Sequence, residues 1–375
     1  MRQAAISPTA ARAGPGLGKG ASLKLKPGRA DAPVRHLEAK WTFAARGARV
    51  RPIKRGRAQS ASQETNVTTL LISHPACLAH DMGEGHPERP DRLRAIERAL
   101  EAETFQMLAR DTAPRADLAA IARVHPRAYI EAIQAAEPAH GHKRLDADTS
   151  MSPGTTEAAL RAAGGAVFAV DEVMSGKARN AFVAARPPGH HAEIATPMGF
   201  CFFNNAAIAA RHAEAAHGAE RVAIVDFDVH HGNGTQAIFW DDPAVMYAST
   251  HQMPHYPGTG ALGERGEHEQ IVNAPLRAGD GGEVFREAME TAILPRIEAF
   301  SPDLIIVSAG FDAHRRDPLG DINLVEADYV WATRKLMEIA RKKAHERVVS
   351  LLEGGYDLEG LARSVAAHVT ALMEG

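Results

Sequence analysis

The chain has 375 residues, of which 45% are hydrophobic, so its length allows one large α/β domain or two small ones. Its two cysteines, Cys77 and Cys201, are far apart and follow no paired pattern. This argues against a disulfide framework or a thiolate metal site and indicates a reducing compartment such as the cytoplasm. No apolar run approaches the length that crosses a bilayer, so no membrane partner is expected.

The formal charge of −3 hides an asymmetry along the chain. Residues 1–63 contain fourteen Lys or Arg against Asp31 and Glu38 alone, and the remainder is therefore acidic. An acidic body would not attract a nucleic-acid backbone, but it suits a cationic substrate such as a lysine side chain or a polyamine.

Residues 1–65 are predicted to be a disordered basic extension, because Ala, Gly, Arg and Pro dominate without strand alternation or a helical stripe. This stretch could instead be an organelle transit segment, although serines are sparse. A further alternative is that translation begins at Val67, where the first strand opens.

Residues 66–375 are predicted to be one domain, because strands alternate with helices and no linker or internal repeat interrupts them. Short branched, apolar runs predict strands, which we expect at 68–73, 181–185, 222–225, 244–250, 303–308 and 347–352. Helical periodicity predicts helices near 90–100, 118–124, 126–136, 153–174, 206–217, 238–240, 283–300 and 326–342, and at the C-terminus. The small residues within 153–174 should allow this helix to pack closely on the sheet.

Two polar loops leave alternatives open. Residues 87–92, Pro-Glu-Arg-Pro-Asp-Arg, follow His74, His80 and His86, which resemble metal ligands. We favour a role in fixing loop geometry or an interface for this stretch, as is more usual for an arginine beside a carboxylate. Residues 140–149 could flank a substrate entrance or be a solvated connection.

Polar side chains also follow four of the predicted strands. They are the adjacent His190 and His191, the segment 226–233, Asp312, and Tyr356. Because the carboxyl ends of parallel strands share one edge of a sheet, these groups are expected to meet in a single cleft. Each taken alone could be a packing or turn residue, but their common position makes coincidence a poor explanation.

Asp228 and His230 are two residues apart in an extended segment, so their side chains leave the backbone on the same side and could bind one ion. With Asp312 they make a three-ligand site that leaves a position for water, as in catalytic zinc sites. One nitrogen and several oxygens suit zinc best, with Fe²⁺ or Co²⁺ as alternatives. Such a metal lowers the pKa of water and polarises a carbonyl.

Amide hydrolysis also needs a base, an acid and a donor for the oxyanion. The adjacent histidines can supply the first two, and the Tyr356 hydroxyl the third. Asp226 and Asn233 are predicted to orient these imidazoles. A carboxylate stabilises imidazolium whereas an amide only orients a neutral ring, so the histidine paired with Asn233 is better suited to be the base.

From about residue 70 to 372 the chain resembles the histone deacetylase and acetylpolyamine amidohydrolase family, in the form typical of its class II and bacterial branch. The matching strings are Arg-Pro-Pro-Gly-His-His-Ala at 186–192, Gly-Phe-Cys-Phe-Phe-Asn-Asn at 199–205, Asp-Phe-Asp-Val-His-His-Gly-Asn-Gly-Thr-Gln at 226–236, Tyr-Pro-Gly-Thr-Gly at 256–260, Ser-Ala-Gly-Phe-Asp-Ala-His at 308–314 and Glu-Gly-Gly-Tyr at 353–356.

The resemblance implies an arginase-like three-layer α/β/α fold with a central, mostly parallel sheet of eight strands. It implies Zn²⁺ on Asp228, His230 and Asp312. The roles that it assigns are general base and acid for His191, electrostatic partner for His190, oxyanion donor for Tyr356, tunnel walls for Phe200 and Tyr256, and substrate contacts at Gly199 and Gly354.

The resemblance further implies structural potassium. The first ion would be held by the side chain of Asp226 and by the carbonyls of Asp226, Asp228, His230, Ser249 and Thr250. A second alkali site would use carbonyls near Phe239, Asp242 and Val245. Two departures stand out: Asn233 replaces the carboxylate of class I members, and Tyr256 replaces the phenylalanine of many relatives.

The expected function is therefore a zinc-dependent amidohydrolase that removes acetyl or related acyl groups from a primary amine. Acetyl-lysine of a peptide or protein and an acetylpolyamine remain open as substrates, and so does a homo-oligomeric state. A two-metal ureohydrolase is disfavoured, because it would need further Asp ligands where this chain has His231 and Asn233. A non-catalytic acyl-lysine binding module is disfavoured by the intact ligands and Tyr356.

Overall fold

The computed structural model of the protein describes residues 68–375. Their principal sheet has eight strands in the order β2-β1-β5-β10-β9-β6-β7-β8, and every neighbouring pair is parallel. The predicted fold class is confirmed. The predicted basic extension, residues 1–65, lies outside the described residues, so the boundary of the domain stays a prediction.

The strands of this sheet are short, and the central ones are fully buried. Their bounds are β1 Thr69–Ser73, β2 Ala109–Thr112, β5 Asn180–Ala184, β6 Val222–Asp226, β7 Val245–Gln252, β8 Ile271–Leu276, β9 Leu304–Ala309 and β10 Val348–Leu352. A two-stranded antiparallel sheet pairs β3 Lys143–Arg144, which lies within the loop predicted at 140–149, with β4 Ser150–Met151, which follows that loop.

The sequence analysis missed the two edge strands of the principal sheet. β2 is largely exposed, and β8 carries Asn273 and Pro275 in its apolar run. Uninterrupted apolar runs identify strands that are covered on both faces of the sheet. They do not identify edge strands, which have a neighbouring strand on one side only and can carry polar residues.

The helices agree with the predicted ones within a few residues, except at two places. Their bounds are α1 Asp91–Ala99, α2 Leu118–Ile121, α3 Arg127–Ala136, α4 Thr155–Met174, α5 Asn205–His217, α6 Asn233–Ile238, α7 Gly282–Ala288, α8 Leu294–Phe300, α9 Glu326–Lys343 and α10 Leu358–Glu374. The helix predicted at 238–240 begins earlier, at Asn233, and the one predicted at 283–300 contains a π-helical segment, Met289–Ile293. No helix within residues 68–375 combines the length and apolarity needed to span a membrane.

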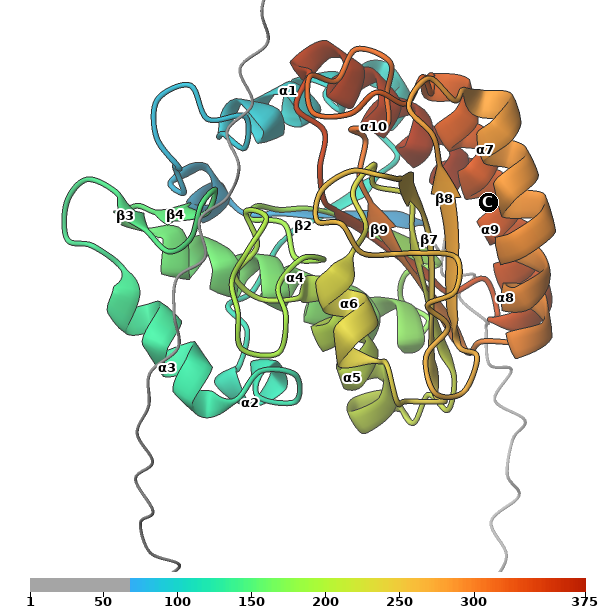
Figure 1. Ribbon diagram of the computed structural model, residues 1–375, viewed down its shortest axis with the longest axis horizontal. Coiled ribbons are helices and arrows are strands. Elements are labelled where there is room, and N and C mark those ends of the chain that lie inside the picture. Colours follow the sequence, from blue (N-terminus) through green and yellow to red (C-terminus); the bar gives the residue numbers. More distant parts are fainter. Residues whose placement is uncertain (1–67) are drawn as a thin grey trace, which may run out of the picture. The chain divides into compact units, whose positions relative to one another are not determined.

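Helices cover both faces of the sheet and complete the three layers (Figure 1). α4 and α5 pack against each other and against the central strands. α9 and α10 form a second contacting pair on the opposite face, with α1 beside α10 and α8 beside α9.

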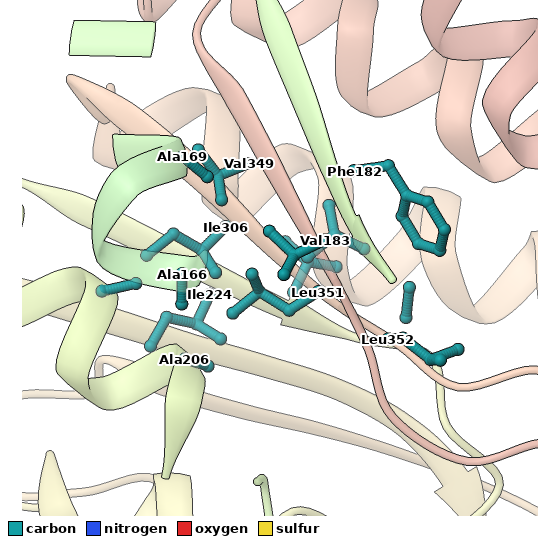
Figure 2. Close-up of a cluster of buried hydrophobic side chains, with 14 of the residues drawn as sticks. Ala166, Ala169, Phe182, Val183, Ala206, Ile224, Ile306, Val349, Leu351 and Leu352 are labelled. Atoms are coloured by element: carbon teal, nitrogen blue, oxygen red, sulfur yellow. The ribbon is translucent and has the colours of Figure 1, made fainter. Parts of the chain in front are cut away.

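The core between the sheet and the α4–α5 pair is apolar and tightly packed. Ala166 of α4 and Ala206 of α5 lie near Ile224, Ile306 and Val183 of three strands, as Figure 2 shows, and these side chains are almost entirely buried. The expectation that small residues bring this helix close to its neighbours is confirmed. A Cβ on Gly164 would lie 2.0 Å from the carbonyl oxygen of Pro114, which no side chain tolerates.

The strand order places the predicted site residues together. β5, β10, β9 and β6 are consecutive neighbours at the centre of the sheet, and they are the four strands followed by the polar segments singled out above. In the register, Asp226 at the end of β6 is paired with Ser308 of β9, and Leu351 of β10 with Val183 of β5. All four carboxyl ends therefore open on one edge.

Candidate active site and metal centre

Three ligating side chains converge where β6 and β9 end. Asp228, His230 and Asp312 are buried, and one ligand atom of each lies within 4.8 Å of the others. His230 Nδ1 is 3.1 Å from both Asp228 Oδ1 and Asp312 Oδ2. One imidazole nitrogen and two carboxylate oxygens thus face a common point, and this donor set fits Zn²⁺.

The backbone holds both carboxylates in place from behind. Gly354 N donates to Asp228 Oδ2 at 2.8 Å, and Val229 N donates to Asp312 Oδ1 at 2.8 Å. Oδ2 of Asp312 and Oδ1 of Asp228 are the oxygens that face the common point, and Asp228 Oδ1 also accepts from His230 N at 2.9 Å. Gly354 must be glycine, because a Cβ there would lie 2.1 Å from Asp312 Oδ2.

The adjacent histidines have different partners. His190 Nδ1 lies 3.0 Å from Asp226 Oδ2, and His191 Nδ1 lies 2.8 Å from Asn233 Oδ1. Burial opposes a charge on either ring, but the carboxylates of Asp228 and Asp226 raise the pKa of His190 to about 10. Burial and the charge of His190 lower the pKa of His191 well below its usual value. The two histidines therefore differ in the predicted sense: the pKa of His190, which is paired with a carboxylate, is raised, and the pKa of His191, which is paired with an amide, is lowered.

A further contact fixes the tautomer of His191. Asn233 Nδ2 donates to Glu193 Oε1 at 3.0 Å, and an ionised carboxylate can only accept. The amide oxygen of Asn233 must therefore face His191, whose Nδ1 carries the proton and donates. This leaves Nε2 of His191 as a free acceptor. The sequence analysis gave Glu193 no role, because only the folded chain shows what it orients.

His191 and His230 line a cavity of about 220 Å³. Its walls are formed by Asp148, His191, Gly199, Phe200, His230, His255, Tyr256, Leu319 and Tyr356. Phe200, Tyr256 and Gly199, which were predicted to contact the substrate, all line this cavity. Gly354 does not line it and lies against the carboxylates of Asp228 and Asp312.

The wall at Gly199 and Phe200 is held in an unusual backbone conformation. Both residues have positive φ, and a Cβ on Gly199 would lie 2.3 Å from the ring of His191. Gly199 N bonds to Asp148 Oδ1 at 3.2 Å, and Phe200 N to Thr149 Oγ1 at 3.0 Å. The loop at 140–149 thus flanks the cavity, which agrees with the first of the two alternatives given for it in the sequence analysis.

Sequence reasoning named none of three further cavity residues, although it offered the loop that carries one of them, Asp148, as a flank of the substrate entrance. They are Asp148, His255 and Leu319, which lie on three separate loops. His255 stacks on His230 with ring centroids 5.0 Å apart, and its Nε2 bonds to the carbonyl of Leu319 at 2.8 Å. No motif spacing connects these loops, so a single sequence gives no signal for their meeting.

Tyr356 reaches the cavity from the loop after β10. Burial raises the pKa of its hydroxyl well above the usual value, so the group stays protonated. The guanidinium carbon of Arg92 lies 4.9 Å from the ring centre of Tyr356, and Phe200 packs edge-on against the ring.

A buried ion network supports the loop that carries Tyr356. Arg92 donates to the carbonyls of Gly355 at 2.6 Å and Glu353 at 2.5 Å, and to Glu88 Oε1 at 3.1 Å. Arg186 also binds both oxygens of Glu88, and all three charged side chains are fully buried. The interpretation of residues 87–92 as fixing loop geometry agrees with these contacts.

Glu353 is a second buried carboxylate that the sequence analysis did not single out. Its Oε2 accepts from Gly189 N at 2.7 Å and His190 N at 3.2 Å, and its Oε1 accepts from Ser308 Oγ at 3.1 Å. Burial raises its pKa to about 7. Glu353 joins the loop of the two histidines to the loop of Tyr356.

The predicted potassium residues lie behind the metal cluster. Asp226, Ser249 and Thr250 are buried, and Asp226 is paired with Ser249 across β6 and β7. The side chain of Asp226 also accepts from Tyr247 Oη at 3.0 Å. At the second predicted alkali site, the carbonyl of Phe239 accepts from Gln270 Nε2 at 2.8 Å. His231, which follows the proposed ligand His230, bonds to Thr259 and Gln236.

Comparison with known proteins agrees with this geometry. The family model described as histone deacetylase domain matches residues 86–372. Histone deacetylase 14, chloroplastic, of Arabidopsis thaliana is 39% identical over 324 residues, covering 81% of this chain and 76% of that protein. The histone deacetylase-like amidohydrolase of Pseudomonas aeruginosa is 40% identical over 278 residues, covering 72% and 73%. The crystal structure of the HDA15 HD domain is similar with a TM-score of 0.78 and 37% identity, covering 82% and 88%. The chain belongs to the histone deacetylase family.

Proposed function

We propose that the protein is a zinc-dependent deacetylase that removes acetyl or related acyl groups from lysine side chains or polyamines. One observation carries the proposal: His230 of the Asp228–His230–Asp312 cluster, His191 of the paired histidines and Tyr356 line one cavity. A non-catalytic binding module would need neither an unprotonated base nor a buried hydroxyl donor in that position.

Zinc would be held by Asp228, His230 and Asp312, whose free donor atoms face one point. When bound, it would lower the pKa of a water molecule and polarise the carbonyl of the substrate. Fe²⁺ or Co²⁺ would suit the same donors.

His191 is the proposed general base. Its Nδ1 is occupied by Asn233, and the ring lines the cavity, so Nε2 is available to take the proton of the attacking water. The same nitrogen can return this proton to the departing amine. His190, bonded to Asp226, is proposed as the electrostatic partner beside it.

Tyr356 is the proposed donor to the oxyanion. Its hydroxyl stays protonated, and the ring is held between Arg92 and Phe200 before substrate arrives. A donor that is already in place costs no reorganisation when charge develops on the carbonyl oxygen.

The cavity supports an extended acylated amine as substrate. Phe200 and Tyr256 provide flat apolar walls for a methylene chain, and Asp148 adds a carboxylate to the lining. That carboxylate could accept from the backbone amides of a peptide or from the ammonium of a polyamine. Both substrate classes therefore stay in the proposal.

Structural potassium behind the site is also proposed, held by Asp226, Ser249 and Thr250. The support is a buried carboxylate beside two buried hydroxyl residues of the neighbouring strand. We expect protein dialysed into a potassium-free lithium buffer to lose turnover and thermal stability, and added KCl to restore both. Identical melting and turnover in the two buffers would contradict this.

The function itself is tested by turnover of zinc-loaded protein on acetyl-lysine peptide, acetylputrescine and longer acyl-lysines, with and without a chelator. We expect release from at least one of the acetyl substrates, loss on chelation and recovery on adding Zn²⁺. No release from any of them would contradict the proposal. The relative kcat/KM values distinguish a peptide deacetylase from a polyamine deacetylase.

A further inference from the structure

A second cluster of ligating side chains lies where α4 and α5 end. Asp171 is in the last turn of α4, and His217 is the last residue of α5. Asp171 Oδ1 lies 2.7 Å from Nε2 of His217 and 2.7 Å from Nε2 of His212. Among residues 68–375, this group and the Asp228–His230–Asp312 group are the two in which three such side chains converge.

The cluster is remote from the cavity. α5 begins at Asn205, whose side chain bonds to the carbonyl of Pro187 beside the paired histidines. At 1.5 Å per residue, His217 lies roughly 18 Å further along the helix axis. A ligand at this cluster would therefore not touch the reacting atoms.

We propose that Asp171, His212 and His217 form a second metal site, which takes a divalent transition-metal ion such as Zn²⁺ or Ni²⁺. Two imidazole nitrogens and one carboxylate oxygen are borderline donors that suit these ions, and water can complete the coordination. The side chains are 12% exposed for His212, 21% for His217 and 43% for Asp171, so an ion can reach them directly from solvent.

The surroundings also favour a cation. The C-terminal ends of α4 and α5 carry partial negative charge, and the carboxylate of Asp171 adds to it. Burial opposes this charge, but the contacts with both imidazoles hold the pKa of Asp171 below its usual range. The carboxylate is therefore ionised and able to bind. An ion here would clamp the two helices that cover one face of the sheet.

Arg123 competes with the ion. Its Nη1 lies 3.0 Å from His212 Nδ1, and because a guanidinium can only donate, this contact places the imidazole proton on Nε2. Coordination through Nε2 requires that proton to leave for solvent and Nδ1 to carry one instead. Metal binding and the Arg123 contact therefore exclude each other. Arg123 is exposed, so its side chain can move away from His212 when an ion binds.

The test compares metal content in variants of the full chain. Metal-free protein is reconstituted with Zn²⁺, freed of excess ion by gel filtration, and measured by atomic emission. We expect His212→Gln/His217→Gln to hold about one equivalent less than the wild type and to show a smaller rise in Tm on adding Zn²⁺. Its turnover should be unchanged, because the remote cluster takes no part in the proposed reaction. Loss of this site is thereby distinguishable from failure of the proposed function.

Two further variants sharpen the test. Arg123→Gln should bind the second Zn²⁺ about tenfold more tightly, on the scale of removing one nearby cation. Asp171→Asn should also lose the second ion, and it replaces the double histidine variant in the test if that variant does not fold. His142→Gln is the matched control, because His142 pairs with Asp81 alone at 3.2 Å and should leave metal content unchanged. Equal zinc content in wild type and Asp171→Asn, or weaker binding by Arg123→Gln, would overturn the proposal.

Discussion

Replacing Tyr356 with Phe should lower kcat by about 10² to 10³-fold, the scale of losing one oxyanion donor. The ring contacts with Arg92 and Phe200 remain in this variant, so the cavity keeps its shape. Only the hydroxyl, which would donate to the developing negative charge, is lost. Steady-state kinetics on an acetyl-lysine peptide measures the effect.

Zinc content and Tm serve as controls for this variant. Both should equal those of the wild type, because Tyr356 is not in the ligand set and its hydroxyl lies in the cavity lining. A variant that keeps wild-type kcat would remove the assigned role of the hydroxyl. One that loses zinc would show that the ring supports the ligands instead.

Replacing His191 with Ala should lower kcat/KM by about 10³-fold or more, because one nitrogen is proposed to act as base and then as acid, and proton transfer by a positioned group contributes about 10² to 10⁴-fold. The ligands Asp228, His230 and Asp312 are untouched, so zinc should remain bound. Single-turnover kinetics separates this loss from any change in product release. Activity within tenfold of the wild type would contradict the role.

Changing Asn233 to Asp tests the same role without removing the base. A carboxylate at this position favours the imidazolium of His191 and raises its pKa. Below the raised pKa the base is protonated and cannot accept, so the acidic limb of the kcat/KM profile should move to higher pH. Activity should recover as the pH rises past that limb. A loss that is the same at every pH would indicate a structural defect.

The clustering of the three candidate metal ligands could be predicted from sequence because its signal is largely local. Asp228 and His230 follow a buried strand two residues apart, and that spacing alone puts both side chains on one side. Asp312 follows a second buried strand, and in a parallel sheet the two ends must share an edge. Tyr356 was found in the same way, after a further strand, and the family motifs then assigned separate roles to His190 and His191.

The supporting groups could not be predicted, because their contacts join segments that no local rule connects. Glu353 precedes two glycines, and its sequence context indicates only a turn. In the structure its carboxylate accepts hydrogen bonds from Gly189 N and His190 N, in the loop that carries the paired histidines. Glu88 lies 98 residues from Arg186, which it binds with both oxygens. Only the folded structure shows that these charged side chains are buried and paired with each other.

The position of β10 has a consequence for the synthesis of the protein. Among residues 68–375 it is the last strand in sequence, yet it lies between β5 and β9 at the centre of the sheet. Without residues 348–352, the strand groups β2-β1-β5 and β9-β6-β7-β8 have no hydrogen-bonded strand that joins them. The paired histidines belong to one half and the metal ligands to the other. The two halves of the site can therefore come together only after β10 has been synthesised, when this one strand closes the sheet and brings Tyr356 with it.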